Sequence, residues 1–256
     1  MFFDHTVLAI IIISVSVFLL VTSTSPLVGS VLYFGLPSLY LVLRKPCIFK
    51  RVLAPTFIFG LVYAIGFEYL NEVGGSWVFP LAHTFVFPEL FFNIVPGDVI
   101  VWYVLWAFTV VAYYEYFFDR HTTCTLVYRR IYKALGLGLF ALGIIAVAEY
   151  LLHIQIVIPF AYTVTGLAAF IPVFILYKRK PAIFSKLIKT IPFLALFFLL
   201  MEFVALTVGY WEFTGDSLFM FWIGGHTLPV EEIIFWILAS PLVISAYHEL
   251  FLDDEV

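Results

Sequence analysis

The sequence predicts an all-α polytopic membrane protein with about eight transmembrane helices, arranged as two parallel repeats of four helices. Three observations lead to this fold class: an apolar composition, long hydrophobic runs, and motifs that recur at a near-constant spacing. Of the 256 residues, 64% are hydrophobic and 12% are charged, and the mean hydropathy is +1.09. A soluble domain of this length could not bury so much apolar surface, so a lipid bilayer is the expected environment.

The hydrophobic runs are long enough to cross a bilayer, because about 20 apolar residues span its hydrocarbon core as a helix. The first run begins at Thr6 without a basic segment before it, which favours a retained helix over a cleaved signal peptide. The predicted helices cover residues 6–22, 27–43, 52–70, 98–118, 134–151, 156–177, 188–208 and 230–252.

The lysine and arginine residues predict the orientation. All thirteen fall into three groups, which follow the second, fourth and sixth predicted helices. With eight helices these connections share one face, and the positive-inside rule makes that face cytoplasmic. We therefore expect a plasma-membrane protein with both termini in the cytoplasm and its acidic connectors outside. The groups are Arg44, Lys45, Lys50 and Arg51; Arg120, Arg129, Arg130 and Lys133; and Lys178, Arg179, Lys180, Lys186 and Lys189.

Motifs that recur 133 to 135 positions apart predict the repeats, 1–133 and 134–256. Because each repeat contains four helices, both have the same orientation, which makes them parallel repeats. The connectors that follow the third and seventh helices are apolar and aromatic, so we expect them to lie in the interface or to fold back over a cavity. The matching segments are 44–49 with 179–184, 67–69 with 201–203, 75–79 with 209–213, and 96–98 with 229–231.

An acidic pair opens the last predicted helix. Pro229 suits the first turn of a helix, and Glu231 and Glu232 follow it, where the positive end of the helix dipole favours a carboxylate. Capping of the helix end is one role for this pair, and a functional site at membrane depth is the other. Glu68 and Glu202 also lie near the outer face, which has no lysine or arginine. If buried, they must lose their charge, bind a cation or hydrogen-bond to neutral groups.

The second half carries an acid, a short gap, Gly-x-Trp-x-Phe, a connector and Pro-x-Glu-Glu-x-x-Phe-Trp. This pattern resembles the membrane-integral lycopene cyclase domain of archaea, of paired bacterial subunits and of fungal fusions to phytoene synthase. The resemblance implies an enzyme of carotenoid biosynthesis, an intramolecular lyase or isomerase that works as two copies of the domain. The matching residues are Glu202, Gly209, Trp211, Phe213, Pro229, Glu231, Glu232, Phe235 and Trp236.

Two features depart from the pattern. The first half has Asp98 followed by Val99 in place of the acidic pair, and eight helices are more than two copies of that domain imply. Either the first half supports a catalytic second half, or the substrate is another polyene or isoprenoid.

Cyclisation of a linear polyene end group needs a proton donor, a base and a cavity that excludes water. A proton adds to an alkene, the neighbouring double bond attacks the resulting cation, and a proton is then lost. No cofactor and no metal are predicted. Glu231 is the predicted acid or base, Glu232 is its partner, and Glu202, Asp98 and Glu68 are further candidates.

Aromatic rings can stabilise a desolvated cation by roughly 2 kcal/mol each. An interfacial aromatic belt is the alternative role for the tryptophans. The predicted substrate-binding residues are Trp77, Trp211, Phe213, Trp222, Phe235 and Trp236.

Other functions compete with cyclisation. A carotenoid or isoprenoid hydratase shares the protonation step but captures the cation with water. A small proton- or cation-coupled transporter would also use parallel repeats and acids in the membrane. His83, His153 and His226 lack the close spacing of a metal-dependent hydroxylase. The expected partners are a hydrophobic polyene substrate and the lipid bilayer, with no nucleic acid; a homo-oligomer or a complex with other carotenoid enzymes stays open.

Overall fold

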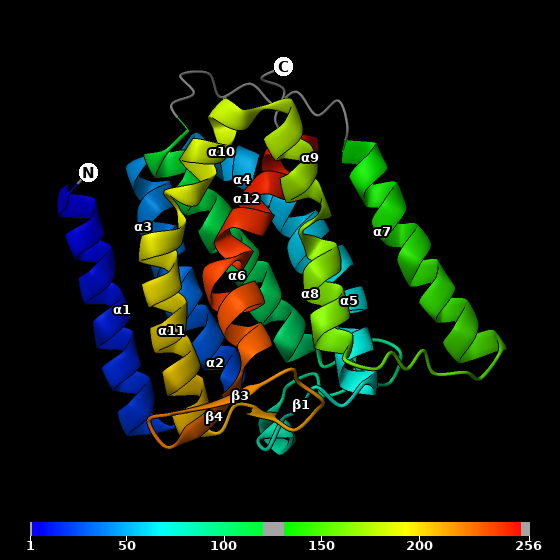
Figure 1. Ribbon diagram of the computed structural model, residues 1–256. Coiled ribbons are helices and arrows are strands. Elements are labelled where there is room, and N and C mark those ends of the chain that lie inside the picture. The colour runs from blue at the N-terminus through cyan, green and yellow to red at the C-terminus, as the bar shows by residue number, and fades with distance from the viewer. Residues whose placement is uncertain (1, 120–130, 252–256) are drawn as a thin grey trace.

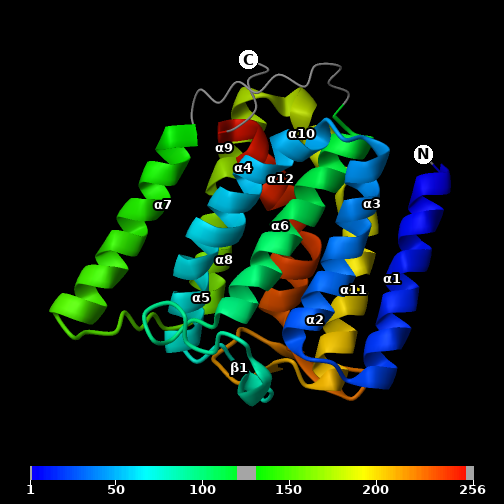
Figure 2. The same cartoon turned by 180° about the vertical axis from the view of Figure 1, so that it is seen from behind.

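The chain forms a bundle of long apolar helices with short strands at one end (Figures 1 and 2). The computed structural model describes residues 2–119 and 131–251. Within them, seven helical spans are long and apolar enough to cross a membrane, which confirms the all-α polytopic class. The spans are Phe2–Thr22 (α1); Pro26–Ser30, Val31–Gly35 and Leu36–Arg44 (α2, η1 and α3); Ile48–Phe57, Ile58–Tyr63 and Ala64–Val73 (α4, η2 and α5); Gly97–Phe117 (α6); Ile131–Ala146 and Val147–Leu151 (α7 and η4); Ala161–Ala169 and Ile171–Arg179 (α8 and α9); and Ile191–Val208 (α11).

The last predicted helix is a bent pair. Helix η5 (Glu232–Leu238) and helix α12 (Ser240–Phe251) meet at an angle of 51°, and they form an eighth span if the pair crosses as one unit. Pro241 explains the bend, because proline lacks a backbone N–H and clashes with the carbonyl group four residues earlier. The turns before it widen into a π-helix, a conformation that often occurs at functional sites.

The predicted helix boundary that differs most from the structure is the start of the sixth span. The sixth span begins at Ala161 rather than at residue 156, and residues 153–158 have no regular secondary structure. Phe160 adopts the left-handed conformation with φ of 52°, and Pro159 before it has no N–H to donate to a helix. The hydrophobicity of this segment predicts a helix from residue 156, but the helical conformation begins only after Phe160.

The two ends of the bundle carry different elements. Helix α1 begins and helix α12 ends at the upper end in Figure 1, where α10 (Pro181–Ile188) and the last turns of α3 and α9 also lie. The described members of the three basic groups belong to this end, which we call the basic end. Arg120, Arg129 and Arg130 lie outside the described residues. The strands lie at the opposite end, which we call the strand end.

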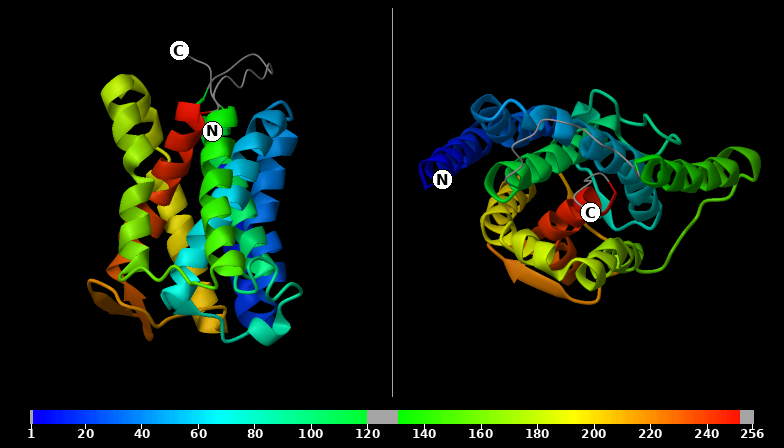
Figure 3. Two further views of the ribbon diagram at one scale, coloured as in Figure 1. Left: turned by 90° about the vertical axis from the view of Figure 1, so that its right-hand side faces the viewer. Right: turned by 90° about the horizontal axis from the view of Figure 1, so that it is seen from above.

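The two apolar connectors form the strand end (Figure 3). β1 (Trp77–Val78) pairs antiparallel with β2 (Glu212–Phe213), so that Val78 lies opposite Glu212. β3 (Met220–Ile223) and β4 (His226–Pro229) form a hairpin. Gly224 and Gly225 make its turn with positive φ angles, as a two-residue hairpin turn requires.

Helix α6 forms the centre of the bundle and packs against α2, α3, α4 and α12. In its most apolar stretch 72% of the residues are buried, whereas the corresponding value for the span Ile131–Leu151 is 22%. Helix α7 therefore lies at the edge of the bundle, as Figures 1 and 3 show. This difference leaves one flank of the molecule open to lipid.

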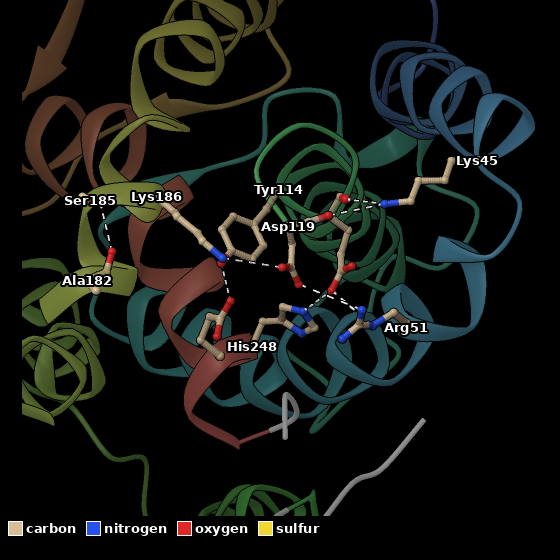
Figure 4. A network of polar contacts seen from close by, with 10 residues as sticks. Lys45, Arg51, Tyr114, Asp119, Ala182, Ser185, Lys186 and His248 are labelled. Carbon is tan, nitrogen blue, oxygen red and sulfur yellow. Dashed lines mark hydrogen bonds and ion pairs between the residues drawn. The ribbon is translucent and has the colours of Figure 1, made fainter. Parts of the chain in front are cut away.

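A network of ion pairs ties the helices together at the basic end (Figure 4). Buried Glu115 of α6 contacts Arg51 Nε of α4 (3.5 Å) and His248 Nε2 of α12 (2.7 Å). Buried Asp119 contacts Lys186 Nζ of α10 (3.8 Å). Both of these buried carboxylates thus have basic side chains beside them, as buried charges require. The network also includes Lys45, Tyr114 and Glu249.

Candidate active site at the strand end

Three glutamates from different spans meet at the strand end. Glu68 of α5, Glu202 of α11 and Glu232 of η5 have exposed fractions of 0%, 3% and 5%. They line one cavity, whose volume is about 60 Å³. The rest of the lining is mostly aromatic: Phe67, Trp77, Phe79, Phe85, Trp102, Tyr103, Tyr162, Tyr210, Trp211, Phe213 and Trp236.

Neutral groups hold the carboxyl group of Glu68. The indole Nε1–H of Trp77 donates to Oε1 of Glu68 (2.9 Å), and the hydroxyl group of Tyr103 donates to Oε2 (2.9 Å). Both oxygens therefore have a donor, and neither donor carries a positive charge. These bonds hold the carboxyl group in one orientation inside an apolar site.

Glu202 and Glu232 form a carboxyl pair. Trp211 Nε1–H donates to Oε1 of Glu202 (2.8 Å), and the Tyr162 hydroxyl group donates to Oε2 of Glu232 (2.6 Å). Both carboxyl groups line the same cavity. Two ionised carboxylates in one apolar site would repel each other, which favours a proton on one of the two groups. The pair is therefore a store for one transferable proton.

The same tryptophan-to-glutamate bond occurs in both halves of the chain, with the partners nine positions apart. Local structure explains it. In the second half, Gly209 ends α11 with φ of 82°, and its N–H donates to the carbonyl oxygen of Ala205. Gly75 has φ of 69° at the corresponding place in the first half. A glycine in the left-handed conformation reverses the chain after a helix, which brings the following tryptophan back to the helix that carries the glutamate.

Aromatic rings pack closely around the carboxyl groups. Trp102 stacks on Trp236 with ring centroids 5.1 Å apart, and it contacts Trp211 edge-on at 5.8 Å. Trp77 contacts Tyr162 edge-on at 5.3 Å. The faces of such rings carry negative electrostatic potential and attract cations.

The predicted substrate-binding residues fall into three sets. Trp77, Trp211, Phe213 and Trp236 line the cavity with the glutamates. Phe235 lines a neighbouring cleft and packs against Gly166 of α8. Trp222 lies on β3 with 71% of its surface exposed, and it lines neither space.

The sequence prediction does not include three lining residues that bind the glutamates or stack on Trp236: Trp102, Tyr103 and Tyr162. A signal for Trp102 exists, because it lies 134 positions before Trp236, the same offset that relates Glu68 to Glu202. Tyr103 is its neighbour on α6. Tyr162 has no such signal, since only the packing of α8 beside η5 places its hydroxyl group on Glu232.

Asp98 and Glu231 hold the connectors in place. The carboxylate of Asp98 accepts the backbone N–H groups of Val86 and Phe87, each at 2.9 Å. Oε1 of Glu231 accepts the backbone N–H of Leu218 (2.8 Å) and a second bond from Thr163 (2.7 Å). Asp98 also lines the cavity, whereas Glu231 is not among its lining residues.

The site differs from the basic end in its charge. Among residues 2–119 and 131–251, no lysine, arginine or histidine lines this cavity. The same described residues contain no cluster of three or more histidine, cysteine or acidic side chains that could hold a metal ion. The chemistry that the arrangement itself offers is proton transfer between carboxyl groups inside an aromatic cavity.

Comparisons of the chain with models of protein families, with curated proteins and with solved structures find no significant match. The functional argument therefore depends on the geometry of the site.

Proposed function

We propose that the protein is a membrane enzyme that cyclises the linear end group of a polyene, such as the carotenoid lycopene, by adding and removing a proton. One observation carries this proposal: three buried glutamates share an aromatic cavity that has no basic lining residue in the described part of the chain. Burial of acids without basic partners is costly and is typical of functional sites in membranes. The resemblance of the second half to the lycopene cyclase domain supports the same conclusion.

The reaction needs one proton and no redox partner. The Glu202–Glu232 pair gives its proton to the terminal double bond, which breaks an O–H bond and forms a C–H bond. The neighbouring double bond then attacks the cation, forms the ring bond and moves the positive charge to an adjacent carbon. Glu68 removes a proton from the carbon beside it, which leaves a new double bond. The proton then returns from Glu68 to the pair, so the product has the same composition as the substrate.

The aromatic wall stabilises the intermediate. Trp102, Trp211 and Trp236 pack together on one side of the cavity, and a ring face contributes roughly 2 kcal/mol or more to a desolvated cation. Their bulk also excludes water, which would otherwise capture the cation and form an alcohol.

The proposal assigns to Glu232 the role of acid that the sequence pattern favours for Glu231. Successive residues of a helix point about 100° apart, so only one of these neighbours faces the cavity. Glu232 lines it together with Glu202, and Glu231 binds the backbone of the connector instead.

We also propose that the chain consists of two parallel repeats, residues 1–133 and 134–256. Each half contributes one tryptophan–glutamate pair. The strand pairing also supports it, because Val78 lies opposite Glu212, the residue 134 positions later. Val99 lines the cavity at the position that corresponds to Glu232. In our proposal the second half therefore supplies the acid and the first half supplies the base.

The depth of the acids favours an enzyme over a transporter. Glu68 lies five residues before the end of α5, and Glu202 lies six residues before the end of α11. At 1.5 Å per residue these positions are about 8 and 9 Å from the helix ends. They are therefore closer to one surface than to the middle of a hydrocarbon core about 30 Å thick.

The test is to express the chain in a bacterium that accumulates lycopene and to analyse its pigments by chromatography and mass spectrometry. We expect a product of unchanged mass that absorbs at shorter wavelength, and no such product from the Glu232→Gln variant. A product heavier by one water would identify a hydratase. Unchanged lycopene in cells that contain the protein in their membranes would reject lycopene as the substrate and would favour transport.

A further inference from the structure

The cavity that Glu68, Glu202 and Glu232 line is called the acid cavity below. A second, larger space opens on the flank of the bundle. We call it the side cleft; its volume is about 440 Å³. Its walls come from η2, α5, α6, α7, α8, η5 and α12, and no charged residue lines it in the described part of the chain. Small residues keep it wide, among them Gly66, Ala141, Ala168 and Ala169.

The side cleft and the acid cavity share a wall. Phe67, Tyr103, Tyr162 and Trp236 line both spaces. Two of these residues bind the glutamates, since Tyr103 donates to Glu68 and Tyr162 donates to Glu232. A single layer of side chains therefore separates the apolar cleft from the carboxyl groups.

The side cleft lies on the flank that faces lipid. Helix α7 borders it and is the span that is least buried in the bundle, with 22% of its most apolar stretch covered. Ala141 of α7 and Ala168 of α8 are both exposed in the described structure and both line the cleft. Figure 3 shows α7 at the edge of the molecule, apart from the central helices. A hydrocarbon in the bilayer can therefore reach the cleft without passing through water.

We infer that the side cleft holds the long apolar chain of an isoprenoid substrate, while the end group of that chain lies among Glu68, Glu202 and Glu232. This inference rests on the proposed function. The volume of the side cleft lies within the roughly 300–1,000 Å³ of small-molecule pockets, so it can hold the apolar chain of one substrate molecule. A phospholipid headgroup would find no charged partner among its described lining residues, whereas an uncharged linear hydrocarbon needs none.

The experiment measures pigment binding and cyclisation separately. Each variant is expressed in lycopene-accumulating bacteria and purified in detergent, and the pigment retained per protein is measured by absorbance. Ala168→Trp places a large ring in the side cleft. Leu167→Trp places the same ring on the preceding residue, which is exposed and does not line the cleft.

We expect Ala168→Trp to retain at least about tenfold less pigment per protein than the wild type, a loss of about 1.4 kcal/mol in binding free energy, and to form less cyclic product. Leu167→Trp should match the wild type in both measurements. Glu232→Gln should retain a wild-type amount of pigment and leave it linear. If Ala168→Trp aggregates on size-exclusion chromatography, Ala141→Trp replaces it, with Leu139→Trp as its control.

The two proposals can fail independently. If the wild type retains lycopene without cyclising it and Ala168→Trp does not retain it, the side cleft stands and the cyclase proposal is wrong. If Ala168→Trp retains as much pigment per protein as the wild type, the side cleft is not the binding site, whether or not the pigment is cyclised.

Discussion

At the scale of single residues, Glu231 and Glu232 are neighbours in the chain with different surroundings. Glu232 lines the cavity together with Glu202 and accepts a hydrogen bond from Tyr162. Glu231 accepts the backbone N–H of Leu218 and the hydroxyl group of Thr163. The first arrangement suits proton transfer, and the second fixes a loop.

This difference predicts opposite results for matched substitutions. Glu232→Gln should lower the rate of cyclisation at least about 100-fold, since general acid catalysis contributes roughly 10²- to 10⁴-fold. Glu231→Gln should keep most of the activity, because an amide oxygen still accepts both hydrogen bonds. The measurement is the initial rate of lycopene conversion in isolated membranes that contain equal amounts of each variant. An inactive Glu231→Gln beside an active Glu232→Gln would return the acid role to Glu231.

At the scale of elements, glycine turns bring the tryptophans to the glutamates. Gly209 has φ of 82°, and a Cβ atom there would meet no atom within 4 Å. A side chain at this position is therefore destabilising because the left-handed backbone conformation disfavours a Cβ atom, and not because the side chain clashes with a neighbour. Trp211 follows two residues later and donates to Glu202, so this turn links the end of α11 to the carboxyl pair.

Gly209→Ala should lower the free energy of unfolding by about 1–2 kcal/mol, the cost of a left-handed conformation for a residue with a Cβ atom. Gly143→Ala is the matched control, because a Cβ atom at this helical position also meets nothing within 4 Å. That substitution should raise stability by roughly 0.5–1 kcal/mol, since alanine favours helices more than glycine does. Denaturant-induced unfolding in detergent micelles, followed by circular dichroism, measures both. Equal free energies of unfolding for the Gly209→Ala and Gly143→Ala variants would show that alanine does not strain the turn at Gly209.

At the scale of the whole molecule, charge divides the two ends. The basic end contains the buried network in which Glu115 contacts Arg51 and His248. The strand end carries the glutamate site, without a basic lining residue in the described chain. We propose that the basic end faces the cytoplasm, because positively charged connections are retained on that side.

Cysteine labelling tests this orientation. In a variant whose native cysteines are replaced by serine, Asp216→Cys places a thiol at the strand end and Ser185→Cys places one in α10 at the basic end. Both positions are exposed in the described structure. A maleimide that does not cross membranes should label Asp216→Cys in intact cells, and it should label Ser185→Cys only after the cells are opened. The reverse pattern would invert the proposed topology.

The membrane class and the approximate positions of the spans could be predicted from the sequence. Both follow from local properties, since the length and hydropathy of a segment decide whether it can cross a bilayer. The sequence also identified Glu68, Glu202 and Glu232 as candidates, because acids are rare in such segments. The bend in the last span and the later start at Ala161 depend on backbone conformations that hydropathy does not report.

The contacts between side chains of different spans could be identified only in the folded structure. Glu68 and Glu232 are 164 positions apart, yet they line one cavity. The Tyr162 hydroxyl group reaches Glu232 from another span, and β1 pairs with a strand from the other half of the chain. The physical reason is that side-chain contacts between spans depend on how helices rotate and pack against one another. A pattern along one helix records which face is apolar, but it does not record which neighbour that face will contact.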